Sequence, residues 1–470
     1  MLKRVLIANR GEIAVRIIRE CLDSSVEAVA VYSEADRQAL HAVIASRSVC
    51  IGPGKASESY LSINNLIEAA KGTGCDAVHP GFGFLSENGD FARACEDAGL
   101  KFIGPSSDVI DRMGNKAEAR KLMQQAGVPV VPGSDGVVRN ADEAAAEAER
   151  IGFPVLLKSS AGGGGRGMRK VFDAEHVKEA FTAASLEAAS CFGCGDMYVE
   201  KLIENPRHIE FQILADRFGN VVHLYERDCS IQRRNQKLVE EAPAWGLSEE
   251  LREKMGAAAV KAARACGYEN AGTVEFVVDK EENFYFIEMN TRIQVEHPVT
   301  EAVTGVNIVR EQLRIASGLP LSISQADVTV TGHALECRIT AENVFKDFMP
   351  CPGTVDFIHF PAGAGIRVDS ALYNGCEISP YYDSMVAKVI ARGETRLEAI
   401  RRMRRALEEM VITGVETTLP VQHLLMYNQA FLRGGYDTGF LEKELPEILN
   451  IYEEAGGRND QLDQSISKKA

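Results

Sequence analysis

Residues 287–296, Ile-Glu-Met-Asn-Thr-Arg-Ile-Gln-Val-Glu, alternate between two kinds of side chain over ten positions. Successive side chains of a β-strand point to opposite faces, so the alternation predicts a strand with one packed face and one polar face. The polar face carries Glu288, Asn290, Arg292, Gln294 and Glu296. A merely solvated strand face would more typically carry Lys, Ser and Thr. Two carboxylates, two amides and an arginine favour a chemical site over the alternative, an edge strand with a polar outer face.

This polar face is too long for one site. Glu288 and Glu296 would lie roughly 26 Å apart in a fully extended strand. We therefore expect either a bend after Asn290 or two neighbouring subsites. Carboxylates are hard oxygen ligands for Mg²⁺, and a guanidinium group binds oxyanions in a fork geometry.

Length and composition limit the class of protein. A chain of 470 residues exceeds one ordinary core and predicts two to four domains or subdomains. The net charge of −15 argues against a nucleic-acid or membrane-surface binder. The 11 cysteines are scattered without a disulfide-framework spacing, no apolar stretch approaches a transmembrane span, and the first residues lack a signal-type apolar run. These features predict a reducing, cytoplasmic location.

The first hundred residues alternate short apolar runs with amphipathic stretches. We expect strands at 4–9, 26–32, 77–79 and 100–104, with helices at 12–21, 60–71 and 90–98. This alternation predicts a doubly wound α/β domain with a parallel sheet over residues 1–114.

The remaining chain predicts a second domain over 115–330 and a C-terminal α+β domain over 331–450, followed by a polar tail at 451–470. Within the second domain, a Pro/Gly-punctuated crossover introduces a small module at about 131–202, which suits a mobile lid. We expect long strands at 209–215, 220–226, 271–278 and 283–290, and helices at 115–127, 248–267, 307–317 and 395–410.

A glycine-rich segment, Lys158 to Met168, follows a predicted buried strand. Four consecutive glycines expose backbone N–H groups that can surround a phosphate, and Lys158 adds a positive charge. The segment is not a Walker loop, because no Gly-Lys-Ser/Thr follows at the required offset. A flexible linker is the alternative reading.

Two further patterns indicate chemistry. The strand 273–277 and the strand 284–290 read as a hairpin in which Glu275 faces Glu288 and Asn290, a plausible Mg²⁺ site shared with substrate phosphates. The cationic stretch 227–237 reads as an anion pocket, with a solvated loop as the alternative. The lone pair Cys191 and Cys194 lacks a second ligand pair, so we expect a glycine-rich loop with incidental thiols in preference to a zinc or redox site.

Taken together, these segments resemble the biotin carboxylase family of the ATP-grasp superfamily over residues 1–450. The resemblance rests on long motifs in the family's order: IANRGEIA at 7–14, HPGFGFLSEN at 79–88, FIGP at 102–105, MGNK at 113–116, the KSSAGGGGRGM segment, ENPRHIE at 204–210, ERDCSIQRRNQK at 226–237, EMNTRIQVEHPVTE at 288–301, GHALECRI at 332–339 and PYYDSMVAK at 380–388.

The resemblance implies a set of ATP contacts and a metal site. The implied ATP-binding residues are Lys116, Lys158, Gly164, Gly165, Glu200, Lys201, Leu202, Ile203, His208, Gln232, Asn235, Glu275, Val277 and Glu288. Glu275, Glu288 and Asn290 would hold Mg²⁺ or Mn²⁺, with two ions expected.

It also implies the chemistry. Lys237, Arg292, Gln294 and the backbone of Val295 would bind bicarbonate. Glu296 would deprotonate bicarbonate for attack on the γ-phosphate, giving carboxyphosphate. Its breakdown to CO₂ and phosphate would be followed by carboxylation of biotin, with Arg338 stabilising the biotin enolate. The implied catalytic set is Glu296, Arg292, Arg338 and Lys237, and the biotin contacts are Arg338 and Phe82.

The chain departs from the family pattern at two of these positions. Phe82 stands where Tyr is usual, and Asn235 where His is usual. We expect these departures to change KM without abolishing activity.

The implied partners follow from what the chain lacks. It has no Ala-Met-Lys-Met motif and no carboxyltransferase, so a separate biotin carboxyl carrier protein and carboxyltransferase subunits are implied. The resemblance to the family also implies a homodimer. The commonest setting is acetyl-CoA carboxylase, which feeds malonyl-CoA to fatty acid synthesis, and a split pyruvate or propionyl-CoA carboxylase is the alternative. A carboxylate-amine ligase of the same superfamily and a nucleotide sensor without catalysis are the rival functions.

Overall fold

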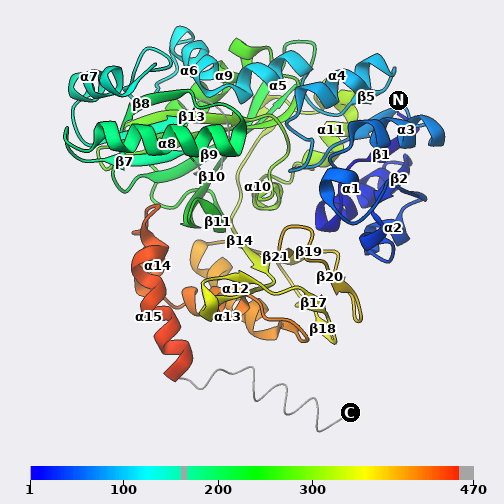
Figure 1. Ribbon diagram of the computed structural model, residues 1–470. Helices are drawn as coiled ribbons and strands as arrows, with labels where there is room; N and C mark the ends of the chain where they lie inside the picture. Colours follow the sequence, from blue (N-terminus) through cyan, green and yellow to red (C-terminus); the bar gives the residue numbers. More distant parts are fainter. Residues whose placement is uncertain (1, 160–166, 455–470) are drawn as a thin grey trace.

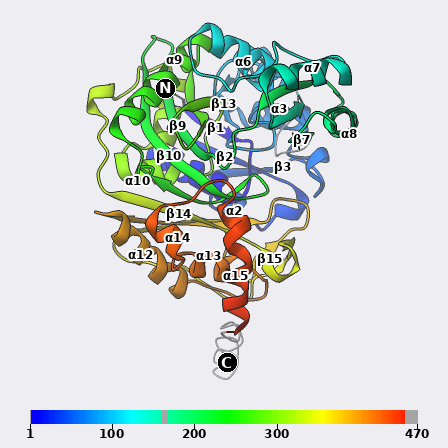
Figure 2. The same ribbon diagram turned by 90° about the vertical axis from the view of Figure 1, so that its left-hand side faces the viewer.

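The computed structural model describes residues 2–159 and 167–454. Figure 1 shows the N-terminal region (blue) on one side, the small module (cyan to green) on the other, and the C-terminal region (yellow to red) below both. The C-terminal helix lies at the left-hand side of this lower part in Figure 1 and faces the viewer in Figure 2. None of the described helices combines the length and the apolar character that crossing a bilayer requires.

The N-terminal region contains a five-stranded sheet in the order β3-β2-β1-β4-β5, with every neighbouring pair parallel. Its strands are β1 (Arg4–Ile7), β2 (Glu27–Tyr32), β3 (Arg47–Cys50), β4 (Ala77–His79) and β5 (Lys101–Phe102). Its helices are α1 (Gly11–Asp23), α2 (Leu40–Ile44), α3 (Ile63–Thr73), α4 (Gly89–Asp97) and α5 (Ser107–Gly114). The doubly wound fold is confirmed. Strand β3 was not predicted, because its side chains are mostly exposed and form no apolar run.

The small module is a three-stranded antiparallel sheet in the order β7-β6-β8. It comprises β6 (Val155–Ser159), β7 (Met168–Val171), β8 (Met197–Lys201), α7 (Ala141–Ile151) and α8 (Val177–Phe192). Both helices pack on this sheet and share a hydrophobic cluster with it. The centre of the glycine-rich segment, including Gly164 and Gly165, lies outside the described residues.

One eight-stranded antiparallel sheet forms the middle of the molecule, in the order β13-β12-β9-β10-β11-β14-β21-β19. Its strands are β9 (Arg207–Ala215), β10 (Val221–Arg233), β11 (Gln236–Ala242), β12 (Asn270–Val278), β13 (Phe284–Asn290), β14 (His333–Thr340), β19 (Ile366–Ser370) and β21 (Met385–Gly393). Strand β11 pairs with β14, so the sheet runs without a break from the second predicted domain into the C-terminal one.

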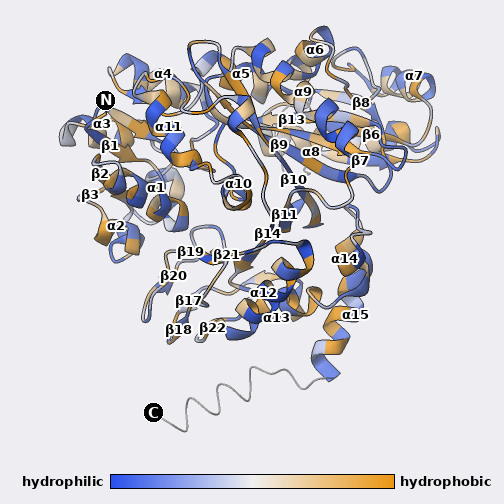
Figure 3. Ribbon diagram, turned by 180° about the vertical axis from the view of Figure 1, so that it is seen from behind, coloured by the Kyte–Doolittle hydropathy of each residue, from blue (hydrophilic) through white to orange (hydrophobic). Residues whose placement is uncertain are grey.

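Helices cover this sheet and complete the C-terminal region. They are α6 (Lys116–Gln125), α9 (Glu249–Cys266), α10 (His297–Thr304), α11 (Ile308–Ala316), α12 (Arg396–Glu409), α13 (Leu419–Leu425), α14 (Gln429–Arg433) and α15 (Phe440–Glu454). Helices such as α5 and α12 carry both hydrophobic and hydrophilic residues, as expected for helices with one packed face (Figure 3). Residues 451–454, placed in the predicted tail, continue α15.

The described part of the chain also contains several short strands and 3₁₀ turns. The remaining strands are β15 (Glu342–Asn343), β16 (Met349–Pro350), β17 (Gly353–Thr354), β18 (Ile358–His359), β20 (Glu377–Ile378) and β22 (Val411–Ile412). The 3₁₀ turns are η1 (Glu34–Asp36), η2 (Ala56–Glu58), η3 (Gln325–Asp327) and η4 (Val344–Lys346).

The structure decides three local questions that the sequence raised. The predicted strand 287–296 ends at Asn290, and the chain bends there, which was one of the two expected outcomes. The alternative of a solvated loop for the stretch 227–237 is wrong, because the stretch forms the end of β10, a turn, and the start of β11. Cys191 lies in the last turn of α8 and not in a loop, with Cys194 just beyond the helix.

The turn between β10 and β11 contains two residues in the left-handed conformation. Arg234 and Asn235 both have positive φ, at 50° and 65°. A two-residue hairpin turn with positive φ at both positions favours Asn, because its short side chain tolerates the left-handed conformation. Asn235 is therefore compatible with the turn, and its side chain is exposed.

Candidate active site

Glu296 lies at the end of the irregular segment 291–296, directly before α10, and is fully buried. Its two oxygens accept from different strands of the large sheet. Lys237 Nζ on β11 donates to Oε1 over 2.7 Å, and Arg338 Nη2 on β14 donates to Oε2 over 3.0 Å. The bend after Asn290 thus brings Glu296 back against the middle of the sheet.

Lys237 contacts three carboxylates of this cluster. Its ammonium donates to Glu296, to Glu210 Oε2 (2.5 Å) and to Glu275 Oε1 (2.9 Å). Glu210 also accepts from Arg227 Nε over 2.6 Å, and both of these side chains are fully buried. Three carboxylates therefore share one ammonium group, and they tolerate this proximity because cations lie between them.

Arg338 joins two carboxylates. Its Nε donates to Glu240 Oε1 over 2.6 Å while Nη2 donates to Glu296. Glu240 is fully buried on β11, opposite Glu336 in the β11–β14 register. The guanidinium fork is therefore held in place by Glu240 on one side, with its other side directed at Glu296.

The neighbours of each glutamate decide its charge. Burial alone would raise the pKa of Glu296, but Lys237, Arg338 and Arg227 hold it well below its usual range. Burial likewise acts to raise the pKa of Glu275, and Lys237 and His208 lower it well below 4.5. For Glu240 burial prevails over Arg338, and the pKa rises to about 7. Glu296 is thus ionised and able to accept a proton.

The hairpin of β12 and β13 supplies the predicted metal ligands. Glu275 and Glu288 are register partners, and Asn290 Nδ2 donates to Glu275 Oε1 over 2.8 Å. His208 Nε2 lies 3.0 Å from Glu275 Oε2. Glu288 is half-buried and pairs with Lys116 Nζ at 3.1 Å. Oxygen donors on adjacent strands beside a lysine are a suitable arrangement for a hard divalent cation and phosphate oxygens.

Arg292 is held by the N-terminal region. Its Nε donates to Glu87 Oε2 over 2.9 Å, and Glu87 Oε1 accepts from the backbone N–H of Thr291 over 3.1 Å. The same guanidinium donates to Gln294 Oε1 (2.8 Å) and to Asn290 Oδ1 (3.1 Å). Gln294 Nε2 in turn donates to Glu275 Oε1 over 3.2 Å. Arg292, Gln294 and Glu275 thus form one network with Lys237.

The remaining predicted residues occupy the small module and the neighbouring strands. Lys158 Nζ on β6 donates to Glu200 Oε2 on β8 over 2.7 Å, and Lys201 Nζ donates to the carbonyl of Phe153 over 2.8 Å. Leu202 and Ile203 directly follow β8. Val277 on β12 is the register partner of His208 on β9. Gln232 Nε2 donates to the Cys229 carbonyl over 3.3 Å.

Two predicted positions lie at the edges of this arrangement. Phe82 follows β4, is half-buried, and offers its carbonyl to Asn9 Nδ2 over 2.7 Å. Val295 offers its carbonyl to Lys388 Nζ over 2.7 Å.

In the predicted anion pocket, Lys237 joins the cluster and Arg227 supports it, whereas Arg233 and Arg234 pair with Asp347 at the surface.

Several residues of this network were not predicted, namely Glu87, Glu210, Glu240 and Lys388. A signal for Glu210 existed, because His208, Glu210 and Gln212 alternate with three apolar residues along β9. Glu87 carried no such signal, since its partner is 205 positions away in sequence.

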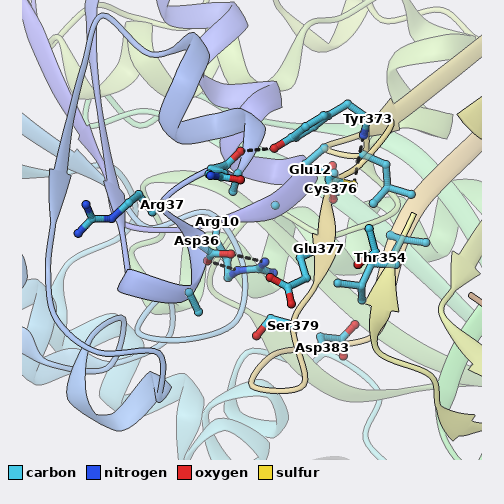
Figure 4. Close-up of a pocket in the computed structure, with 18 of the residues that line it drawn as sticks. Arg10, Glu12, Asp36, Arg37, Thr354, Tyr373, Cys376, Glu377, Ser379 and Asp383 are labelled. Atoms are coloured by element: carbon cyan, nitrogen blue, oxygen red, sulfur yellow. Dashed lines mark hydrogen bonds and ion pairs between the residues drawn. The ribbon is translucent and has the colours of Figure 1, made fainter. Parts of the chain in front are cut away.

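A separate cavity of about 380 Å³ lies between the N-terminal and C-terminal regions, and none of the predicted site residues that the structure describes lines it. Figure 4 shows it lined by Glu12, Tyr373 and Glu377, among others, with Arg10 paired to Asp36.

Three family profiles match the chain. "Biotin carboxylase, N-terminal domain" matches residues 1–110, "Carbamoyl-phosphate synthase L chain, ATP binding domain" matches 115–324, and "Biotin carboxylase C-terminal domain" matches 336–443.

The similarity to a bacterial relative extends almost from end to end. Biotin carboxylase 1 of Bacillus subtilis is 56% identical over 443 residues, covering 94% of this chain and 98% of the relative.

Solved structures agree with the fold. The biotin carboxylase domain dimer of Hydrogenobacter thermophilus 2-oxoglutarate carboxylase, with MgADP, ADP and bicarbonate, superposes with a TM-score of 0.92 at 50% identity, covering 95% of this chain and 98% of that one. The structure of the biotin carboxylase component of a pyruvate carboxylase gives a TM-score of 0.83 at 52% identity, covering 95% and 99%.

Proposed function

Because the chain belongs to the biotin carboxylase family, we propose that it uses ATP and bicarbonate to carboxylate the biotin of a carrier protein. The observation that carries this proposal is the buried carboxylate of Glu296 between Lys237 and Arg338. A base, an ammonium group and a guanidinium group in one buried cluster are what the activation of a small oxyanion requires.

Glu296 is the proposed base, and its neighbours tune its strength. With two cations donating to it, the low pKa of Glu296 makes it a weak base. A bicarbonate anion that accepts hydrogen bonds from Lys237 and Arg292 would take part of this cationic stabilisation for itself. The proton affinity of Glu296 would then rise at the moment when bicarbonate must lose its proton.

The nucleophile formed in this way would attack the γ-phosphate of ATP and release ADP. Carboxyphosphate would break down to CO₂ and phosphate, and the phosphate would remove the N1′ proton of biotin. Arg338, held by Glu240, is placed to stabilise the enolate oxygen that develops on biotin. Phe82 is the proposed apolar contact of biotin.

Lys116 on α6 and Lys158 on β6 are the proposed partners of the ATP phosphates. Both lysines hold carboxylates in this structure, Glu288 and Glu200 respectively, and a phosphate would replace these partners. The adenine would lie along Glu200 to Ile203, and Gly164 and Gly165 would close over the phosphates. His208, Gln232, Asn235 and Val277 complete the proposed nucleotide contacts.

Glu275, Glu288 and Asn290 would hold Mg²⁺ or Mn²⁺, because they offer carboxylate and amide oxygens on adjacent strands. When bound, the ions would neutralise the phosphate oxygens of ATP.

The proposed partners are a biotin carboxyl carrier protein, carboxyltransferase subunits and a second copy of this chain. We propose acetyl-CoA carboxylase as the complex it serves. A split pyruvate carboxylase is the second candidate, because a structure at 52% identity is the biotin carboxylase component of a pyruvate carboxylase.

The test is ADP release from Mg-ATP with free biotin, with and without bicarbonate, for wild type and Glu296→Gln. Glutamine keeps the volume and removes the base, so we expect turnover to fall by about 100-fold or more. Glu409→Gln makes the same chemical change at a surface pair with Arg405 and should not alter turnover.

Three results would contradict the proposal. Turnover that ignores bicarbonate and biotin would favour a carboxylate-amine ligase. Tight ATP binding without turnover would favour a nucleotide sensor. Equal loss of activity in Glu296→Gln and Glu409→Gln would remove Glu296 from the chemistry.

A further inference from the structure

Lys388 is a fully buried lysine on β21 that none of the roles above includes. Its ammonium donates to the carbonyl of Val295 over 2.7 Å. It also lies 3.1 Å from Glu12 Oε1 on α1 and 4.0 Å from Asp369 Oδ2 on β19. One cation therefore connects the N-terminal region, the C-terminal region and the backbone residue that precedes Glu296.

The register of the large sheet places Lys388 beside Arg338. The two residues are direct partners in the antiparallel pair of β14 and β21, so their side chains project from the same face. Arg338 reaches the side chain of Glu296, and Lys388 reaches the carbonyl of the residue before it. Two neighbouring cations thus hold consecutive residues of the same segment.

The segment 291–296 needs such support, because it contains neither strand nor helix. Each of the three backbone carbonyls that precede Glu296 has a side-chain hydrogen-bond partner. Arg292 Nη1 donates to Ile293 O (3.2 Å), His297 Nδ1 lies 2.8 Å from Gln294 O, and Lys388 donates to Val295 O. Of these three, Lys388 alone comes from a different part of the chain.

The contact with Val295 constrains Glu296 through covalent geometry. The carbonyl of Val295 and the N–H of Glu296 belong to one planar peptide group. Fixing the direction of this carbonyl therefore fixes the backbone from which the Glu296 side chain extends.

Stability alone does not explain a charge at this position. Burying an ammonium group is costly, and pairs such as Lys388 with Glu12 are often replaceable by apolar residues without loss of stability. The contact that an apolar residue could not reproduce is the hydrogen bond to Val295.

We propose that Lys388 is a positioning residue that orients the Val295–Glu296 peptide and so aims the Glu296 carboxylate at bicarbonate. This inference rests on the proposed function. It assigns a role to a residue that would touch neither bicarbonate nor ATP, and it predicts weaker use of bicarbonate with an unchanged KM for Mg-ATP.

The experiment compares Lys388→Met with Glu12→Gln in the full-length chain. Both substitutions break the Glu12–Lys388 ion pair, but only the first removes the donor to Val295. For Lys388→Met we expect kcat/KM for bicarbonate to fall by about 10- to 100-fold, because a small misplacement of a reacting group has effects of this size. The KM for Mg-ATP should stay within about twofold of wild type, since the proposed ATP contacts lie on other elements. Glu12→Gln should keep both kinetic parameters near wild type.

Two results would overturn the inference: equal kinetic losses in the two variants, or a parallel rise of both KM values in Lys388→Met. Either would show a general structural role. If Lys388→Met fails to fold, the double variant Lys388→Met/Glu12→Gln replaces it, because it leaves no unpaired buried charge at this pair. The same loss of kcat/KM for bicarbonate and the same unchanged KM for Mg-ATP are expected for it. A wild-type chain without bicarbonate-dependent turnover would instead refute the proposed function.

Discussion

At the scale of single residues, the buried glutamates around Arg338 differ in charge although all are inaccessible to solvent. Glu296 has two cationic donors and a depressed pKa, whereas burial raises the pKa of Glu240 to about 7 despite its bond to Arg338. Burial raises the pKa of Glu336 further, and neither of its oxygens has a hydrogen-bond partner among the described residues. Similar burial thus gives one ionised base and neighbours that hold protons more readily.

The raised pKa of Glu240 has a consequence for stability. Between about pH 4.5 and 7 the folded chain binds a proton at Glu240 that the unfolded chain does not, so this group's contribution to stability is lost as pH rises through that range. Gln cannot titrate. We therefore expect Glu240→Gln to gain stability relative to wild type when the pH is raised from about 5 to 7.5. The difference in thermal midpoint between variant and wild type should increase by an amount equivalent to about 1–3 kcal/mol.

Thermal denaturation at both pH values checks this prediction. Glu409→Gln is the control, because the pKa of Glu409 is lowered and its titration lies below this range. A constant difference between Glu240→Gln and wild type across the range would contradict the assignment.

Glu288 allows a test of the metal site. Its carboxylate pairs with Lys116 and is the more exposed of the two proposed carboxylate ligands. Glu288→Gln keeps an oxygen donor but loses the charge, so the Mg²⁺ concentration for half-maximal ADP release should rise by about tenfold or more. Glu281→Gln, in the turn of the same hairpin, should leave this concentration unchanged. Equal Mg²⁺ requirements in the two variants would argue against Glu288 as a ligand.

At the scale of elements, the end of α14 packs closely against the loop that precedes α9. Gly434 ends α14 with φ of 75°, and a Cβ built there would lie 2.0 Å from Trp245 Cδ1. Trp245 is the only tryptophan and precedes α9. The guanidinium of Arg396, from α12, lies 5.4 Å from its ring. The missing side chain at Gly434 thus lets a loop before α9 pack against the C-terminal region.

Gly434→Ala should therefore destabilise the chain by about 1–3 kcal/mol, through left-handed strain and the clash with the indole. The fluorescence of Trp245 should change as well, because its environment is displaced. Gly435→Ala is the matched control, since a Cβ there meets nothing within 4 Å. Thermal denaturation and emission spectra measure both effects. Identical behaviour of the two alanine variants would contradict this packing argument.

At the scale of the whole molecule, the small module is the part most separable from the rest. It has its own three-stranded sheet and its own hydrophobic cluster, whereas the N-terminal sheet shares a hydrophobic cluster with the eight-stranded sheet that runs into the C-terminal region. Lys158 belongs to this module, and Lys116 and Glu288 belong to the body. A nucleotide that binds both lysines would therefore hold the module against the body.

We expect Mg²⁺ with a non-hydrolysable ATP analogue to slow hydrogen–deuterium exchange in β6, β8 and α7. Exchange in β1 and β2, which lie in the N-terminal sheet, should not change and serves as the internal control. The expectation fails if the analogue binds and exchange in the module stays the same.

The sequence by itself determined the elements and most members of the site. Period-two and helical patterns are local, so they predicted the parallel N-terminal sheet, the hairpin that pairs Glu275 with Glu288, and a chemical role for Lys237, Arg292 and Glu296. The resemblance to the family added Arg338 and the nucleotide contacts. Where local patterns were weak, as in the exposed strand β3, the element was not predicted, whereas the bend after Asn290 was one of the two outcomes expected for the segment 287–296.

Tertiary structure alone decided which charges meet. Glu87 with Arg292, Glu240 with Arg338, and Lys388 with Val295 are separated by 205, 98 and 93 positions in sequence. Their pairing depends on sheet order, on register and on the bend after Asn290, and none of these is encoded in a short window. The charge of a buried carboxylate depends on such distant neighbours, because the electrostatic interactions that set its pKa act through space and not along the chain.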